Sequence, residues 1–416
     1  MKKITKYNLM TTATALGALF GAPSAFAQSS VTLYGIIDAG FNYDNNVQTS
    51  RTGAGLKGAS QYTFQDGATG GIRGSRWGLR GVEDLGGGLK ALFTMENGFS
   101  INNGTLAQGG AEFGRQLFVG LQDNYGSITL GRQYDSLVDY LQPFLSGASW
   151  AGYLGAHAGD IDNELNTHRI NNSIKFASAT YSGFRFGGLY SLGGVPGSVG
   201  RDQVWSLGAG YSNGPVALGA AYLNARNPNF SFYGTNPNAG TSATSNNLGS
   251  LGSVTTPESN PIYAGYASAS TTQILSAAGS YQLGAATIGL LYSNVQFKGL
   301  GSLSGPDPLG FSGTAKFDNA EANFRYQLTP SWLAGLAYVY THASGASGQP
   351  GAIYHQVQTG TDYFLSKRTD VYVIVAYQHA SGTDSLGQPA VAYITGQSPS
   401  SNNHQIAARI GVTHRF

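Results

Sequence analysis

The stretch GSRWGLRG, residues 74–81, places basic and bulky apolar side chains at alternating positions. Arg76 and Arg80 fall on one parity, whereas Trp77 and Leu79 fall on the other. Successive side chains of a β-strand point to opposite faces of the sheet. The stretch therefore predicts a strand with one charged face and one apolar face, and each face needs an environment that suits it.

Period-two alternation recurs along the chain and predicts sixteen strands, from residues 31–43 to residues 403–416. Seven short connectors alternate strictly with eight long ones, which cover residues 44–71, 100–111, 134–168, 194–201, 227–271, 299–315, 343–351 and 381–402. A β-solenoid or an adhesin sandwich has no reason to sort its connectors by length. A transmembrane β-barrel does, because its periplasmic turns are short and its outer loops are long. The sequence therefore predicts an all-β fold, a 16-stranded antiparallel transmembrane β-barrel with a water-filled lumen.

The N-terminal segment predicts export from the cytoplasm. Three lysines, an apolar stretch and the sequence AFA at residues 25–27 form the pattern of a secretory signal peptide over residues 1–27. The remaining residues, 28–416, show no domain boundary and are expected to form one barrel.

Loss of the three lysines turns the formal net charge of +2 into −1, so no nucleic-acid partner is expected. The chain contains no cysteine, so disulfides do not stabilise it.

The parity of the strands predicts which side chains face lipid and which face the lumen. In the first strand, Leu33 lies on the apolar parity and Asp38 on the polar one. In the last strand, Ile410 and Arg409 divide in the same way. A charge on the lipid side costs about 2–4 kcal/mol at the midplane of the bilayer, so Arg76 and Arg80 are expected to face the lumen. Residues 331–343 are apolar on both parities, which favours a subunit contact or a position near a rim.

Longer motifs resemble the trimeric general diffusion porins of Gram-negative bacteria, in their β-proteobacterial branch. The resemblance is carried by SSVTLYGIIDAG at residues 29–40, GSRWGLRGVEDLGGGLKALFTMENGF at 74–99, FGRQLFVGL at 113–121, GSITLGRQYDSLVDY at 126–140 and the terminal GVTHRF. It implies a homotrimer in the bacterial outer membrane, in contact with lipid and lipopolysaccharide. It also implies that Phe416 is the C-terminal signal read by the machinery that inserts such barrels.

The resemblance also implies a constriction. In that family the loop after the fifth strand folds into the lumen, and here this loop is about residues 134–168. Its acids would face a basic ladder on the barrel wall and create a transverse field for passive diffusion of ions and small hydrophilic solutes. The expected loop acids are Asp135, Asp139, Asp160, Asp162 and Glu164, and the expected wall residues are Arg76, Arg80, Arg115, Arg169 and Lys175. Ile36 stands where many relatives have a lysine, which removes one wall charge.

Other functions have weaker support in the sequence. A solute-specific channel is the main alternative, but most aromatic residues lie on the lipid-facing parity or in loops. An enzyme is not expected, since neither a GxSxG elbow nor a GxxxxGK phosphate loop is present. No cofactor and no metal are expected, because the seven histidines include no i, i+4 pair. His157 and His168 share the 134–168 loop with several acids, which leaves a structural cation as an alternative.

Overall fold

The computed structural model describes residues 29–52, 55–234, 245–303 and 305–416, and the expected signal peptide, residues 1–27, lies outside them. β-Strands account for most of the described chain. Within those ranges no helix is both long enough and apolar enough to cross a membrane.

Seventeen strands form one antiparallel sheet. Those of the first half are β1 (Ser30–Thr52), β2 (Gly55–Asp66), β3 (Arg76–Gly86), β4 (Leu89–Gly98), β5 (Gln116–Gln122), β6 (Gly126–Gln133), β7 (Ile170–Ser178) and β8 (Phe184–Ser191). Those of the second half are β9 (Val204–Asn213), β10 (Val216–Arg226), β11 (Thr271–Leu283), β12 (Ala286–Leu300), β13 (Gly313–Thr329), β14 (Trp332–Ser344), β15 (Ala352–Phe364), β16 (Thr369–Gly382) and β17 (His404–Arg415).

The helical segments are short and lie in the connectors. Two are α-helical, α1 (Ser136–Leu141) and α2 (Pro228–Ser231). The remainder are single turns, η1 (Gly67–Thr69), η2 (Gln108–Gly110), η3 (Gln142–Phe144), η4 (Gly147–Ala151), η5 (Gly152–Gly155), η6 (Ala158–Asp160) and η7 (Ala264–Tyr266).

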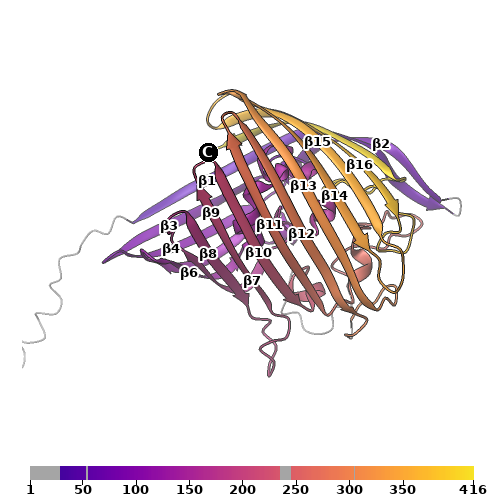
Figure 1. Ribbon diagram of the computed structural model, residues 1–416, viewed down its shortest axis with the longest axis horizontal. Helices are drawn as coiled ribbons and strands as arrows, with labels where there is room; N and C mark the ends of the chain where they lie inside the picture. Colours follow the sequence, from indigo (N-terminus) through magenta and orange to yellow (C-terminus); the bar gives the residue numbers. More distant parts are fainter. Residues whose placement is uncertain (1–28, 53–54, 235–244, 304) are drawn as a thin grey trace, which may run out of the picture.

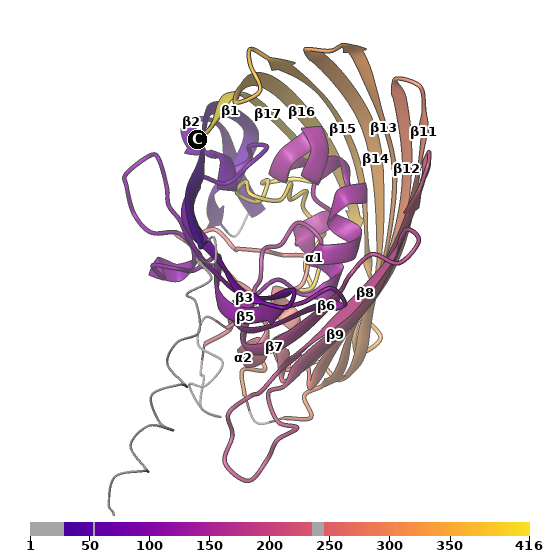
Figure 2. The same cartoon turned by 90° about the vertical axis from the view of Figure 1, so that its left-hand side faces the viewer.

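The sheet closes on itself because β1 pairs with β17 on one edge and with β2 and β3 on the other (Figures 1 and 2). Residues 39–52 of β1 pair with β2, and residues 30–36 pair with β3. β2 and β3 thus occupy one position in the wall, so the ring has the sixteen predicted positions. Closure leaves no unpaired sheet edge, which is what a strand structure inside a bilayer requires.

The hairpin that β1 and β2 form corrects one expectation. Residues 44–71 were expected to form a loop, but β1 continues to Thr52 and β2 returns from Gly55 to Asp66. The polar composition of this hairpin hides it, because it extends beyond the apolar part of the wall and lacks clean alternation. The short and long connectors elsewhere alternate as predicted, from Gly87–Gly88 between β3 and β4 to residues 383–403 between β16 and β17.

The parity prediction is confirmed at both ends of the chain. Leu33 and Ile410 are 58% and 59% exposed on the outer surface, whereas Asp38 and Arg409 are fully buried on the inner one. The outer side chains are apolar and have no protein partner to cover them, as expected of a surface that faces lipid.

Residues 134–169, between β6 and β7, pack inside the ring of strands (Figure 2). Helix α1 contacts β9 and β10, and η4 contacts β14, β15 and β16. Trp150 lies on Gly335, where an added Cβ would stand 2.1 Å from the indole ring, and it packs with Ala337. The inner apolar side chains of residues 331–343 are therefore covered by this segment, and the second apolar face needs no subunit contact to explain it.

The interruption between β2 and β3 is held by a buried ion pair. Arg409 Nη2 donates to Asp38 Oδ1 at 3.0 Å, and the same carboxylate accepts from Tyr372 Oη at 2.6 Å and from the backbone N–H of Arg73 at 2.9 Å. Both charged side chains are completely buried. Removal of one partner leaves the other charge buried and uncompensated, which costs about 3–5 kcal/mol.

We therefore expect Asp38→Asn to lower the free energy of unfolding by about 3–5 kcal/mol, because Arg409 loses its only carboxylate partner among the described residues. The measurement is denaturant unfolding of the purified protein in detergent, followed by circular dichroism. Glu83→Gln is the control, since Glu83 is exposed on β3 and forms no ion pair there. Equal stability of the two variants would contradict the assignment.

Candidate functional site

Four arginines surround one cavity of about 330 Å³ between the wall and the 134–169 segment. Three of them were expected from the sequence, namely Arg76 on β3, Arg115 just before β5 and Arg169 just before β7. The fourth is Arg73, which lies in the interruption between β2 and β3. The opposite side of the cavity contains Gln142, Pro143, Gly147, Ala148, Tyr153, Leu165 and Asn166. We refer to this space as the arginine passage.

The carboxylate of Glu96 on β4 holds two of these arginines in place. It accepts from Arg115 Nε at 2.7 Å and lies 3.6 Å from Arg76 Nε. It also accepts from the hydroxyls of Tyr34 at 3.0 Å and Tyr134 at 3.1 Å. One carboxylate therefore orients two guanidinium groups and leaves one excess positive charge in this part of the wall.

Arg169 and Arg73 have no carboxylate partner within the described ranges. Arg169 Nη1 donates to the Thr167 carbonyl at 3.0 Å, its guanidinium lies 5.8 Å from the Tyr134 ring centre, and its Nε has no hydrogen-bond acceptor. Arg73 Nη1 donates to the Ala148 carbonyl at 2.7 Å. Burial and then the positive charge of the neighbouring Arg115 lower the pKa of Arg169, and like charges repel each other. A passing anion would relieve that repulsion.

The other two expected wall residues lie elsewhere. Arg80 is exposed with its guanidinium 5.5 Å from the centre of the Tyr34 ring. Lys175 of β7 forms an ion pair with Asp139 and donates to the Tyr134 carbonyl at 2.9 Å. Neither residue lines the arginine passage, so strand parity alone gives the face of a side chain but not its height along the barrel.

Two of the expected loop acids have structural partners. Asp135 is buried at the N-terminus of α1, where Oδ1 accepts from the backbone N–H groups of Leu137 at 2.8 Å and Val138 at 3.3 Å. Its Oδ2 accepts from Asn163 at 2.8 Å. Asp139 pairs with Lys175 as described. Asp135 thus caps the helix and ties the start of the segment to its end, as N-cap aspartates commonly do.

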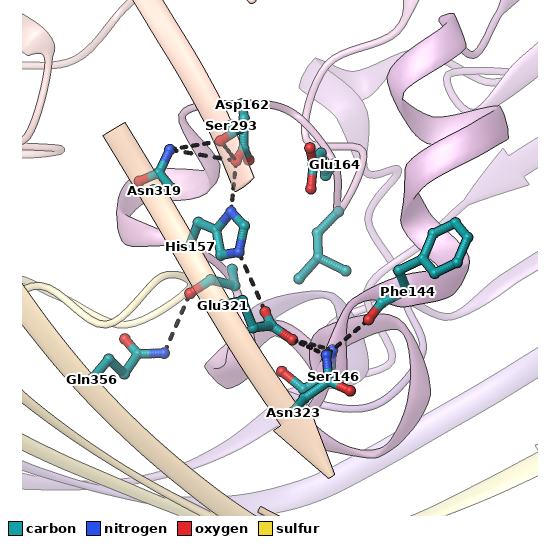
Figure 3. A network of polar contacts seen from close by, with 12 residues as sticks. Phe144, Ser146, His157, Asp162, Glu164, Ser293, Asn319, Glu321, Asn323 and Gln356 are labelled. Carbon is teal, nitrogen blue, oxygen red and sulfur yellow. Dashed lines mark hydrogen bonds and ion pairs between the residues drawn. The ribbon is translucent and has the colours of Figure 1, made fainter. Parts of the chain in front are cut away.

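Asp160, Asp162 and Glu164 are all buried, and Asp162 and Glu164 lie against the wall (Figure 3). Asp160 accepts from the backbone of Leu165 and from Thr167. Asp162 accepts from Ser293 of β12 and Glu164 from Ser276 of β11, both at 2.5 Å. Burial raises the pKa of Asp160 to about 7, and burial followed by the charge of Asp162 raises the pKa of Glu164 well above its usual value.

The expectation that these acids face the arginines is therefore corrected. The loop acids do not line the arginine passage among the described residues. A segment folded inside the barrel must satisfy its own buried backbone and side-chain polar groups, and its carboxylates serve that need. The charged side chains that line the passage are the four arginines, and its other lining residues are neutral.

Three contributors could not be found by sequence pattern. Arg73 lies between β2 and β3, outside any alternating strand pattern, and Glu96 and Tyr134 act through partners that are distant in sequence. The inward parity of β4 predicts that the Glu96 carboxylate faces the lumen. Its partners could not be predicted, because they depend on the pairing register of β3 and β4. The pairing of Gly78 with Glu96 brings it beside the arginine strand.

Phe416 has a defined place at the seam of the barrel. Its backbone exchanges two hydrogen bonds of 3.1 Å with Gly35 of β1. A Cβ at Gly35 would stand 2.2 Å from the phenylalanine ring, so the ring in its observed position packs directly on the glycine.

Comparisons with known proteins agree with this architecture. The family described as Gram-negative porin matches residues 12–383. An outer membrane porin protein of Bordetella pertussis is 39% identical over 227 residues, which are 50% of this chain and 57% of that protein, so the match spans little more than half of this relative. The structure of an anion-selective porin from Comamonas acidovorans superposes with a TM-score of 0.66 at 22% identity, covering 94% of this chain and 100% of that one. The trimer form of an outer membrane protein of Vibrio cholerae superposes with a TM-score of 0.60 at 15% identity, covering 93% and 99%.

Proposed function

Because the chain belongs to the Gram-negative porin family, we propose that it forms a water-filled outer-membrane channel for passive diffusion of small hydrophilic solutes and that anions are preferred. The family is one of channels, and no catalytic role is proposed. The observation that carries the anion preference is the arginine passage, which four guanidinium groups line and in which Glu96 is the only carboxylate that forms ion pairs with them among the described residues.

Residues 134–168 are proposed to be the constriction loop of this channel. Their position inside the ring, with Gln142, Ala148 and Tyr153 opposite the arginines, supports this role. Low-dielectric walls strengthen the field of the clustered cations above its value in bulk water. An anion that enters gains favourable interactions with Arg73 and Arg169, which form no ion pair with a carboxylate among the described residues. A cation meets the same field with the opposite sign.

The assembly is proposed to be a homotrimer embedded in outer-membrane lipid and lipopolysaccharide. The trimer form of the Vibrio cholerae neighbour supports the trimer by similarity of fold. Residues 1–27 are proposed as a signal peptide removed on export. Phe416 is proposed as the signal for the barrel-insertion machinery, and its exposed ring on the outer surface at the seam supports that role.

The experiment that tests the channel is conductance of purified protein in a planar lipid bilayer, combined with swelling of proteoliposomes in small sugars. We expect open channels that close in groups of three and swelling rates that fall as solute size rises. Correctly folded protein that conducts no ions and admits no solute would overturn the proposal.

A further inference from the structure

The inner end of the 134–169 segment carries a buried cluster of one histidine and three carboxylates. His157, Asp162 and Glu164 come from the segment, and Glu321 comes from β13. The side chains of His157, Asp162 and Glu164 are fully buried, and one ligand atom from each lies within 4.8 Å of the others. Figure 3 shows the cluster with Ser293, Asn319 and Glu321 around it.

The charges of this cluster do not balance. Among the described residues, His157 is the only basic side chain at ion-pair distance from these carboxylates, with Nδ1 2.6 Å from Asp162 Oδ2 and Nε2 3.3 Å from Glu321 Oε2. One imidazolium cannot compensate three carboxylates. A buried charge without compensation is costly, so the cluster requires protons or a cation.

Two carboxylate oxygens point to a cation. Asp162 Oδ1 and Glu164 Oε2 are buried and have no hydrogen-bond partner in the described chain, although the second oxygen of each is bonded. Buried polar atoms in folded proteins nearly always have partners. Both free oxygens belong to the group of side chains that can offer ligands to one ion.

We propose that His157, Asp162 and Glu164 bind a divalent transition-metal ion of the Zn²⁺ class, which fastens the 134–169 segment to the wall of the barrel. Imidazole nitrogen with carboxylate oxygen suits Zn²⁺, whereas Ca²⁺ takes six to eight oxygens. Ligand atoms around tetrahedral Zn²⁺ stand about 3.3 Å apart at bond lengths of about 2.0 Å, a spacing that small side-chain shifts can reach from the observed one. Water would complete the coordination.

The surroundings hold these ligands in the required orientation. Glu321 Oε2 lies 3.3 Å from His157 Nε2, and carboxylates commonly hold metal-binding histidines in this way. His157 Nδ1, which lies 2.6 Å from Asp162 Oδ2, would exchange that hydrogen bond for the metal. Glu321 is itself fixed by the Ser146 backbone at 2.7 Å and by Asn323 at 2.6 Å. Ser293 orients Asp162, and Ser276 orients Glu164. Glu321 is thus a positioning residue.

The test measures zinc in purified, folded protein that has been stripped with a chelator, reloaded with Zn²⁺ in the presence of excess Ca²⁺ and Mg²⁺, and freed of unbound ions. We expect one zinc per chain by elemental analysis in the wild type, and loss of that zinc in Glu164→Gln. For Glu321→Gln we expect an affinity about 10–100-fold weaker by calorimetry. Asp384→Asn is the matched control, because Asp384 is a buried carboxylate outside the cluster and its loss should leave the zinc in place.

Exposed histidines supply the competing site that the experiment must separate. His355, His379 and His404 form a row on adjacent strands, with ring centres 6.5 and 4.8 Å apart. His379→Asn should keep the buried zinc. The proposal is overturned if Glu164→Gln retains stoichiometric zinc, if His379→Asn loses it, or if the wild type binds none.

A second measurement covers the case in which Glu164→Gln fails to fold. X-ray absorption at the zinc edge of the wild type should show one imidazole and oxygen ligands at about 2.0 Å. A spectrum with two or more imidazoles would place the zinc on the exposed row and overturn the proposal. Both readouts are independent of ion conduction, so they stand apart from the test of the channel.

Discussion

Arg169→Glu should lower the ratio of anion to cation permeability at least fivefold. Arg169 lines the passage, has no carboxylate partner among the described residues and keeps a free Nε donor. A unit charge about 4 Å from an ion contributes about 1 kcal/mol in a water-like dielectric, which is about a fivefold change in the local concentration of that ion. Charge reversal removes one favourable interaction for anions and adds one for cations. The measurement is the reversal potential in a planar bilayer at low ionic strength, where screening is weak.

Arg80→Glu is the matched control for this result. Arg80 lies on β3, four residues beyond Arg76, and is exposed outside the passage. The same change of charge at this position should alter the permeability ratio much less. If both variants shift the ratio equally, the net charge of the whole lumen sets the selectivity and the passage does not.

Trp150→Ala should release the inserted segment from the wall. Trp150 is 1% exposed and packs on Gly335, Ala337 and Gly360. Truncation of a buried tryptophan to alanine costs about 3–5 kcal/mol. We expect a lower thermal transition, proteolytic cleavage within residues 134–168, and a larger and noisier single-channel conductance, because the segment no longer narrows the lumen.

Trp332→Ala provides the comparison. Trp332 is 45% exposed on the outer surface of β14, the strand that also carries Gly335 and Ala337, and among the described residues it is not part of the apolar cluster around Trp150. Its loss should leave the conductance unchanged. Unchanged conductance and protease resistance in Trp150→Ala would show that other contacts, such as the hydrogen bonds of Glu321 and Gln356 to the segment, hold it alone.

The architecture follows from the sequence to a large extent, and the reason is physical. Lipid on one side and water on the other force an alternation such as Leu33 against Asp38, and this alternation survives without knowledge of any contact. The length of each connector is equally local, which is why sixteen wall positions could be predicted. The hairpin of β1 and β2 was missed because its composition is polar and its sequence lacks clean alternation.

The site could be predicted only in part. Arg76 and Arg115 are found from motif and parity, but the roles of the loop acids depend on how the inserted segment lies. In the sequence, Asp160 and Glu164 cannot be distinguished from acids that face a pore. In the structure, Asp160 accepts from the backbone of its own segment and Glu164 accepts from Ser276. Contacts between residues more than one hundred positions apart leave no local pattern. For that reason the sequence could not show that the lining residues other than the arginines are neutral.

The central claim is that the arginine passage makes the channel prefer anions. The most direct measurement is the reversal potential of the wild-type protein in a planar bilayer that separates two KCl solutions of different concentration. We expect a potential whose sign shows that chloride moves more easily than potassium, and the size of this potential should fall in Arg169→Glu. A potential of the opposite sign in the wild type would contradict this claim.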